Sequence, residues 1–244
     1  MAAEEHYLNV AKVYEKAWCY QDGGDFQLWV CSNIMESLPK FCKSIVDVGC
    51  GTGNFSKLLQ DRAAVPVLGV EPSASMAAQA EGRGVEVVVA DALSWAHSQG
   101  SNVWDAVMLK EVRHHVDDPA ALYRQLAKVL SPNGRLIIVT RPDDSAGYPF
   151  PPKSHGAWRE VNTIPLSCHI EALSHEGFAV KVEQKNFPVK MARADWESFL
   201  RNRTWSHLSS LTDAEIEEGI EALALNDFVE FQDQLILVIA EWAN

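Results

Sequence analysis

The sequence predicts an α/β fold with a mixed sheet of seven strands, mostly parallel, and helices on both faces. Between residues 44 and 141, short β-branched runs alternate with helical stretches, which is the pattern of parallel strands joined by crossover helices. Two more strand-like runs follow at 178–185 and 234–241, and we expect the last strand to be antiparallel. With 244 residues, 47% of them hydrophobic, the chain is expected to form one domain around one core.

The elements of the core, assigned to residues 41–141, follow in order along the chain. Asp118 and Pro119 predict the N-cap and the first position of the helix before the fifth strand. The Ser-Pro-Asn-Gly sequence at 131–134 predicts a turn after that helix. A further helix is predicted at 167–176. The first five strands are predicted at 44–48, 67–70, 85–90, 104–109 and 135–140.

Three segments lie outside this core. Residues 1–40 look helical and aromatic on one side, and we expect them to form a helical cap. Residues 142–165 contain five prolines and two glycines, which predicts a long lid loop at the carboxyl edge of the sheet, where open α/β sheets bind ligands. Residues 190–231 are expected to form a helical insertion between the last two strands. In it, Thr212 and Glu215 have the spacing of a capping box.

Composition restricts the partners of the chain. A net charge of -12 argues against nucleic acid, which usually requires a concentrated basic surface. No apolar run approaches the roughly 20 residues that span a bilayer, and the first residues lack a secretory signal pattern, so we expect a cytoplasmic protein without a membrane partner. The five cysteines are scattered without metal-ligand spacing, so no metal site is predicted. A small-molecule substrate is expected, and the oligomeric state is not indicated.

A glycine-rich turn is the strongest functional signal. Gly49, Gly51 and Gly53 follow the first strand directly and precede a helix that starts at Asn54. Glycines let the backbone approach a ligand, and the helix N-terminus supplies unpaired N–H groups. Dinucleotide sites usually have the pattern G-x-G-x-x-G/A, whose last position is Asn54 here. The turn therefore favours a nucleoside-bearing cofactor without a pyrophosphate.

The octapeptide Val-Asp-Val-Gly-Cys-Gly-Thr-Gly at 46–53 resembles the first motif of the class I S-adenosylmethionine-dependent methyltransferases, which have a Rossmann-like fold. The resemblance covers roughly residues 40–141. It implies that the glycine turn lies beside the methionine portion of S-adenosylmethionine, that Asp47 orders this turn, and that S-adenosylhomocysteine is the product.

The other predicted donor-site residues also follow strands. Glu71 ends the second strand, where a carboxylate can accept two hydrogen bonds from a ribose diol. Asp91 and Leu93 resemble the adenine site of the family, although Asp91 could instead cap the next helix. The predicted donor-site residues are Asp47, Gly49, Cys50, Gly51, Gly53, Glu71, Pro72, Met76, Asp91, Ala92, Leu93, Lys110, Glu111 and His115.

Residues 110–115 follow the fourth strand, where the family places groups between donor and acceptor. Adjacent residues point apart, so His114 and His115 are not expected to share a metal ion, and a structural role or a role in the pocket stays open for both. The Arg113 guanidinium is suited to hold a carboxylate. We predict Arg113 and, in the lid, His155 as catalytic residues; a structural role for His155 is the alternative.

Two hypotheses about the acceptor make opposite predictions about its charge. Aromatic residues of the cap, lid and insertion could wall a pocket for a flat or cationic acceptor. Arg113, Arg141, Arg201 and Arg203 point instead to an acid, and the Thr-Trp-Ser sequence at 204–206 resembles a segment of the trans-aconitate methyltransferase branch. The predicted substrate residues are Tyr14, Trp18, Arg113, Tyr148, Trp158, Arg203 and Trp205.

These observations predict one methyltransferase domain over residues 1–244 that transfers a methyl group from S-adenosylmethionine to a small molecule, with a carboxylate among the acceptors considered. A peptide, protein or amine acceptor is an alternative, and so is a non-catalytic module that binds S-adenosylmethionine. Base-modifying relatives carry an Asn/Asp-Pro-Pro-aromatic segment after the fourth strand, and this chain has none there. The sequence does not indicate whether oxygen, nitrogen or sulfur is methylated, or whether a general base takes part.

Overall fold

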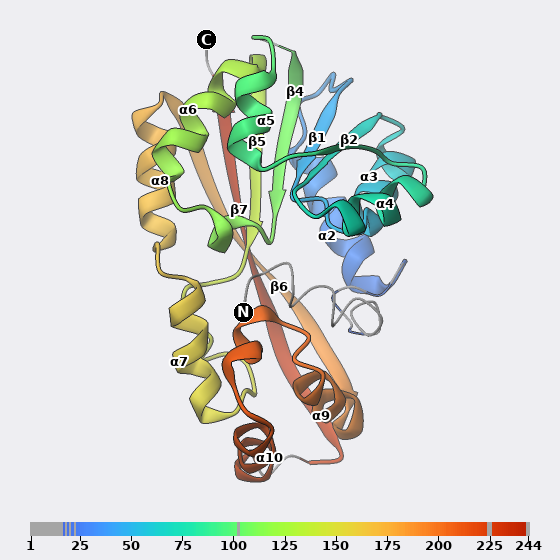
Figure 1. Ribbon diagram of the computed structural model, residues 1–244, viewed down its shortest axis with the longest axis vertical. Coiled ribbons are helices and arrows are strands. Elements are labelled where there is room, and N and C mark those ends of the chain that lie inside the picture. Colours follow the sequence, from blue (N-terminus) through green and yellow to red (C-terminus); the bar gives the residue numbers. More distant parts are fainter. Residues whose placement is uncertain are drawn as a thin grey trace.

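The computed structural model describes residues 17, 19, 21, 23–101, 103–223 and 226–242 (Figure 1). Its sheet has seven strands in the order β3-β2-β1-β4-β5-β7-β6. The first five strands are parallel, and β7 pairs antiparallel with both β5 and β6. The predicted fold class and the antiparallel last strand are confirmed. Most of the predicted N-terminal cap, with Tyr14 and Trp18, lies outside the described residues.

The last two strands extend well beyond their predicted ends. They pair from Phe178 and Trp242 to Ala192 and Phe228, and in Figure 1 they continue past the other strands towards the lower part of the molecule. Pro188 is compatible with β6 because that strand is at the edge of the sheet. The strands are β1 (Ile45–Val48), β2 (Val67–Glu71), β3 (Glu86–Val89), β4 (Trp104–Lys110), β5 (Leu130–Thr140), β6 (Phe178–Ala192) and β7 (Phe228–Trp242).

The predicted turn at 131–134 lies inside β5 instead of before it. The register moves from Trp104 opposite Leu130 to Ala106 opposite Arg135, and Asn133 has a φ of 61°. The Ser-Pro-Asn-Gly residues thus form an irregularity within the strand, because residues on both sides of it pair with β4. The prediction of a turn before the fifth strand is therefore wrong, because these four residues belong to β5.

Helices cover both faces of the sheet. Successive strand residues alternate between two cores: Ile45 packs in the core beneath α2 and α3, whereas Val46 packs in the core beneath α5, α6 and α8. Asp118 caps α6, since its side chain accepts a hydrogen bond from the backbone of Ala121 at 2.9 Å. These helices are α2 (Asp25–Ser37), α3 (Asn54–Ala63), α4 (Ala74–Gly82), α5 (Ala92–Ser98), α6 (Pro119–Val129) and α8 (Leu166–His175). No helix in the described ranges is long and apolar enough to cross a membrane.

A smaller helical part packs around the extended ends of β6 and β7 (Figure 1). The prediction that 142–165 lacks regular structure is wrong over α7, because its prolines stand at the helix start, where their missing N–H groups break no hydrogen bond. The predicted capping box of Thr212 and Glu215 is confirmed at the start of α10. The elements of this part are α7 (Pro152–Val161), α9 (Arg193–Arg201), η2 (Ser206–Ser210) and α10 (Asp213–Ala222).

Candidate functional site

A cavity of about 630 Å³ lies at the carboxyl ends of β1, β2 and β4, and we call it the sheet-edge cavity. Its volume is within the range of about 300–1,000 Å³ that is usual for small-molecule sites. Twelve of the fourteen predicted donor-site residues line it; Asp47 and Gly53 lie behind its wall. The predicted residues in its lining are Gly49, Cys50, Gly51, Glu71, Pro72, Met76, Asp91, Ala92, Leu93, Lys110, Glu111 and His115.

The glycine turn forms one wall of this cavity, and Gly51 and Gly53 are required for different reasons. A Cβ atom on Gly53 would lie 2.7 Å from the Cα of Ala80, so Gly53 is required for close packing of the turn against α4. Gly51 has a φ of 57°, and a Cβ atom there would meet only the Met76 methyl group, at 3.8 Å. Gly51 is therefore required for its backbone conformation, at a point where the turn faces the cavity.

Glu71 ties the end of β2 to this turn. One carboxylate oxygen accepts a hydrogen bond from the backbone N–H of Gly51 at 2.9 Å, and the other accepts from Ser73 at 3.0 Å. Burial raises the pKa of Glu71, and the two N–H groups oppose that shift. Asp91 lines the same cavity. Its carboxylate also accepts a hydrogen bond from the backbone N–H of Ser94 at 2.9 Å, so Asp91 has the helix-capping role that was the alternative for it.

Asp47 connects β1 to α3 beneath the turn. Its carboxylate accepts a hydrogen bond from the Ser56 hydroxyl at 2.6 Å, and its other oxygen is buried without a hydrogen-bond partner. Burial raises the pKa of Asp47 to about 6, although the Ser56 hydrogen bond opposes the shift. The resemblance implied that Asp47 orders the turn, and its place beneath the turn agrees with that role.

Replacing Asp47 by asparagine is expected to change how stability depends on pH. A folded pKa of about 6, above the ordinary value of 3.8, means that the native protein keeps a proton that the unfolded chain releases. This contribution to stability is complete below pH 3.8 and is lost as the pH rises through about 6. The melting temperature of Asp47→Asn, relative to wild type, should therefore increase from pH 4 to pH 7 in calorimetric scans. A constant difference would contradict the assignment, and the exposed Asp195→Asn is the control.

Gln27, on α2, belongs to the sheet-edge cavity and was missed by the sequence analysis. Its side chain is 3% exposed, and its amide nitrogen donates to the carbonyl of Cys19. Its amide oxygen is buried and has no hydrogen-bond partner, which is costly unless a ligand supplies a donor. The one sequence signal was a polar residue between Phe26 and Trp29 on an otherwise apolar stretch. Such a residue shows no function until α2 is placed against the cavity.

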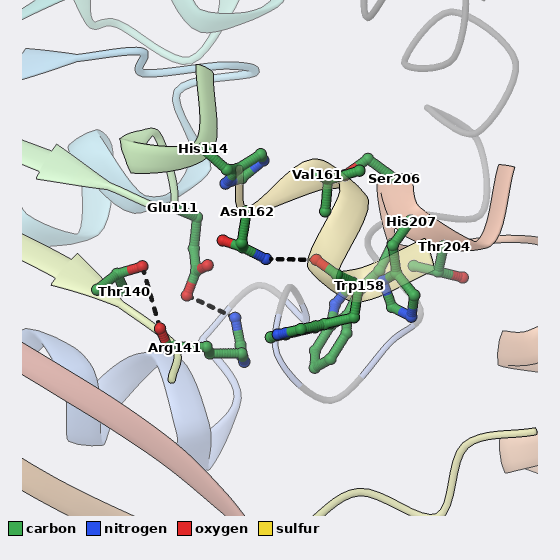
Figure 2. A pocket seen from close by; sticks show the side chains of 11 residues that line it. Glu111, His114, Thr140, Arg141, Trp158, Val161, Asn162, Thr204, Ser206 and His207 are labelled. Carbon is green, nitrogen blue, oxygen red and sulfur yellow. Dashed lines mark hydrogen bonds and ion pairs between the residues drawn. The ribbon is translucent and has the colours of Figure 1, made fainter. Parts of the chain in front are cut away.

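A second, smaller cavity of about 60 Å³ adjoins the first, and we call it the aromatic cavity. Glu111 lines both cavities. Figure 2 shows side chains converging on the aromatic cavity from the turn after β4, from the end of β5, from α7 and from the segment that begins η2. Its lining consists of Glu111, His114, Thr140, Arg141, Trp158, Val161, Asn162, Thr204, Trp205, Ser206 and His207.

Glu111 has the strained backbone that is common at functional sites. Its φ is 58°, a left-handed conformation that costs a residue other than glycine about 1–3 kcal/mol. The conformation is held because the Glu111 N–H donates to the carbonyl of Val139 at 2.8 Å and the carboxylate pairs with Arg141 at 2.5 Å. The strain therefore keeps the Glu111 carboxylate at the junction of the two cavities.

Arg141 is the centre of a buried ionic network beneath the aromatic cavity. Its guanidinium donates two hydrogen bonds to Asp233, at 3.0 and 2.9 Å, and lies 4.3 Å from the centre of the Trp205 ring. Tyr148 donates its hydroxyl hydrogen to Asp233 at 2.8 Å. Burial alone would lower the pKa of Arg141, but Asp233 and Glu111 raise it well above its ordinary value. Arg141 thus stays charged and is committed to two carboxylates.

The two adjacent histidines face different cavities. His114 lines the aromatic cavity and His115 the sheet-edge cavity, yet their ring centres are 4.1 Å apart, so the expectation that they point apart is wrong for the rings. Burial lowers the pKa of His114 to about 3, which keeps its imidazole neutral, and its Nε2 atom is buried without a hydrogen-bond partner. Among the described residues, no group of three or more potential ligands could hold a metal ion.

Arg113 has a different role from the one predicted. Its side chain is 1% exposed and lines neither cavity. Its guanidinium donates to the Ile164 carbonyl and the Asn162 amide oxygen, each at 2.9 Å, and pairs with Asp143 at 2.8 Å. Because the turn after β4 directs this side chain beneath the segment around α7, Arg113 fastens that segment to the sheet and is not available to a substrate.

Other predicted catalytic and substrate residues are also held away from the cavities. His155, on α7, forms a 2.7 Å hydrogen bond with the Ser145 hydroxyl. The Arg203 guanidinium donates hydrogen bonds to the Leu211 carbonyl and to the Asp213 carboxylate. Tyr148 is buried against Asp233 and lines neither cavity. Of the predicted substrate residues, Trp158 and Trp205 do line the aromatic cavity.

Comparison with known proteins bears on the sheet-edge cavity. Residues 46–138 match the methyltransferase domain family. The chain is 34% identical over 113 residues to the chloroplastic tocopherol O-methyltransferase of Arabidopsis thaliana, a match that covers 43% of this chain and 32% of that protein. It is 26% identical over 151 residues to the trans-aconitate 2-methyltransferase of Delftia acidovorans, covering 61% of this chain and 52% of that protein. The chain thus spans about half or less of the length of these two relatives.

The fold also matches that of solved methyltransferases. Geranyl diphosphate methyltransferase in complex with S-adenosylmethionine superposes with a TM-score of 0.57 and 20% sequence identity, covering 87% of this chain and 84% of that one. The residues of the sheet-edge cavity fit S-adenosylmethionine. The glycine turn leaves room for a ligand, and the buried Gln27 amide oxygen has no hydrogen-bond partner, so it can accept a hydrogen bond from one. Residues 46–138 of this chain are thus similar to the methyltransferase domain family, and its fold is that of solved methyltransferases.

Proposed function

We propose that the protein transfers a methyl group from S-adenosylmethionine, bound in the sheet-edge cavity, to a small molecule bound in the aromatic cavity. The observation that carries this proposal is the junction of the two cavities at Glu111. Glu111 lines both a cavity large enough for a nucleoside with an amino acid side chain and a second, much smaller one. Two cavities joined at one residue are the arrangement that direct transfer between two bound molecules requires.

The residues of the sheet-edge cavity have separate tasks in binding the donor. The turn at Gly51 would hold the methionine portion, and the Glu71 carboxylate, which lines the same cavity, would accept hydrogen bonds from the ribose hydroxyls. Asp91 and Leu93, which line the same cavity, would contact the adenine ring, and the unpartnered Gln27 amide oxygen would accept a hydrogen bond from the donor's amino group. When bound, the donor supplies an electrophilic methyl group on a positively charged sulfur.

The wall between the cavities aligns the acceptor and excludes water. An in-line displacement depends chiefly on positioning, which can supply about 7–11 kcal/mol of the barrier reduction. Glu111 and His114 face the acceptor from this wall, and Trp158 closes the opposite side from α7 (Figure 2). Arg113 supports the arrangement from beneath by fastening the segment of α7 to the sheet.

Calorimetric titration with S-adenosylhomocysteine tests the donor site. Wild type should bind it, and Glu71→Gln should bind it roughly tenfold to a hundredfold more weakly, because the neutral amide makes poorer hydrogen bonds to the ribose and to the turn. The control is Glu81→Gln, the same change at an exposed position on α4. Absence of binding by wild type would refute the proposal.

A further inference from the structure

We infer that the acceptor presents an aliphatic amine to the donor, not a carboxylate. The inference rests on the function proposed above and names the acceptor class of the aromatic cavity. Four properties of that cavity lead to it. They are its small size, the pairing of the Arg141 guanidinium with carboxylates, the buried Nε2 atom of His114, and the Glu111 carboxylate where the two cavities meet.

The size of the cavity limits the group that enters it. About 60 Å³ is enough for a few water molecules, since one water requires roughly 10–15 Å³ by this measure. A benzene ring occupies an apolar cavity of about 150 Å³. The aromatic cavity therefore fits a small head group, such as an amino group with its nearest carbons, better than an aromatic ring with its phenolic hydroxyl.

A carboxylate entering this cavity would find no uncommitted guanidinium or ammonium group. Among the described lining residues, Arg141 is the single lysine or arginine, and Asp233 and Glu111 already hold its guanidinium. The arginines that the sequence suggested for an acid are paired elsewhere: Arg113 with Asp143, Arg201 with Glu217 and Arg203 with Asp213. An incoming carboxylate would also face the negative charge of Glu111.

An amine finds complementary groups in the same place. The Glu111 carboxylate is an acceptor for its N–H groups, and the neutral His114 ring offers a buried Nε2 atom without a hydrogen-bond partner. The Trp158 ring adds an aromatic surface that attracts a cation. An alcohol would find the same groups, but an aliphatic hydroxyl is about as weak an acid as water and holds its proton too tightly for a carboxylate to remove.

The transfer then balances as follows. The alkylammonium gives one proton to the Glu111 carboxylate, which passes it on to solvent. The amine lone pair forms a new bond to the methyl carbon while the carbon–sulfur bond of S-adenosylmethionine breaks. The electron pair of that bond stays on sulfur, so S-adenosylhomocysteine and the N-methylated ammonium leave.

The experiment compares three matched probes: n-propylamine, propionate and 1-propanol. Each is titrated calorimetrically into the full-length protein saturated with S-adenosylhomocysteine and is then offered as acceptor with methyl-labelled S-adenosylmethionine. We expect n-propylamine to bind and to be methylated, each with at least about tenfold preference over the other two probes. Glu111→Gln should weaken n-propylamine binding by about tenfold. Glu160→Gln, on the exposed face of the same α7 helix that carries Trp158, should leave it unchanged.

The outcomes separate this inference from the proposed function. Failure of the wild-type protein to bind S-adenosylhomocysteine would overturn the proposed function. Binding of S-adenosylhomocysteine together with preferential methylation of propionate or 1-propanol would overturn the amine assignment alone, and so would the absence of n-propylamine binding. If Glu111→Gln does not fold, the comparison of the three probes on wild type still decides the question.

Discussion

Replacing Gly51 by valine is expected to abolish measurable binding of S-adenosylhomocysteine and to leave the protein folded. Gly51 has a left-handed φ of 57°, which costs other residues roughly 1–2 kcal/mol and a β-branched residue more. The turn would relieve that strain by moving, which would break the 2.9 Å hydrogen bond from its N–H to Glu71. Loss of both contributions should weaken binding by about a hundredfold or more.

The fold should survive this change because a Cβ atom on Gly51 has room. Its nearest neighbour would be the flexible Met76 methyl group at 3.8 Å, whereas the same atom on Gly53 would collide with the Ala80 backbone. Gly82→Val is the matched control, since nothing lies within 4 Å of a Cβ atom there. Titration calorimetry and circular dichroism would measure both variants. Affinity equal to wild type in Gly51→Val would refute the role assigned to the turn.

Replacing Arg141 by methionine is expected to lower the free energy of unfolding by about 3–5 kcal/mol. The change leaves Asp233, whose side chain is 0% exposed, without the guanidinium that holds both of its oxygens. In a chain of this length such a loss lowers the melting temperature by roughly 10 °C. Methionine keeps much of the volume, so the cost reports the stranded charge more than a cavity.

Two further variants identify the cause of that loss. Arg124→Ala removes an arginine whose side chain is 58% exposed and paired with Glu176, and it should cost less than about 1 kcal/mol. Adding Asp233→Asn to Arg141→Met removes the stranded charge, so the double variant should be more stable than the single one. Thermal unfolding followed by calorimetry measures all three. A cost below about 1 kcal/mol for Arg141→Met would show that the network does not stabilise the fold.

Most of the lining of the sheet-edge cavity was predictable because its sequence signals are local. The three glycines follow β1, Glu71 ends β2 and Asp91 comes shortly after β3, and the carboxyl ends of parallel strands meet at one edge of a sheet. Knowing the strands was therefore enough to bring these residues together. Gln27 was missed because its contribution depends on how α2 packs, which no local pattern encodes.

The acceptor site was predicted less well, for a related reason. Arg113 and Arg141 follow neighbouring strands and look equivalent in sequence, but Arg113 turns beneath the segment of α7 and Arg141 faces Glu111 and Asp233. Asp233 lies 92 residues from Arg141 along the chain. Whether an arginine is available to a substrate depends on such long-range partners. Only the folded tertiary structure shows which carboxylate lies beside which arginine.

By itself, the sequence determined the fold class, the glycine turn and the gathering of the predicted donor-site residues around one cavity, because these depend on periodicity and on residues adjacent to strand ends. The tertiary structure alone decided that Trp158 and Trp205 share a small cavity with Glu111 and that the nearby arginines are already paired. The physical reason is that a charge or a ring has a function only relative to its neighbours. Those neighbours come from β5, β7, α7 and the insertion, which meet only when the chain is folded.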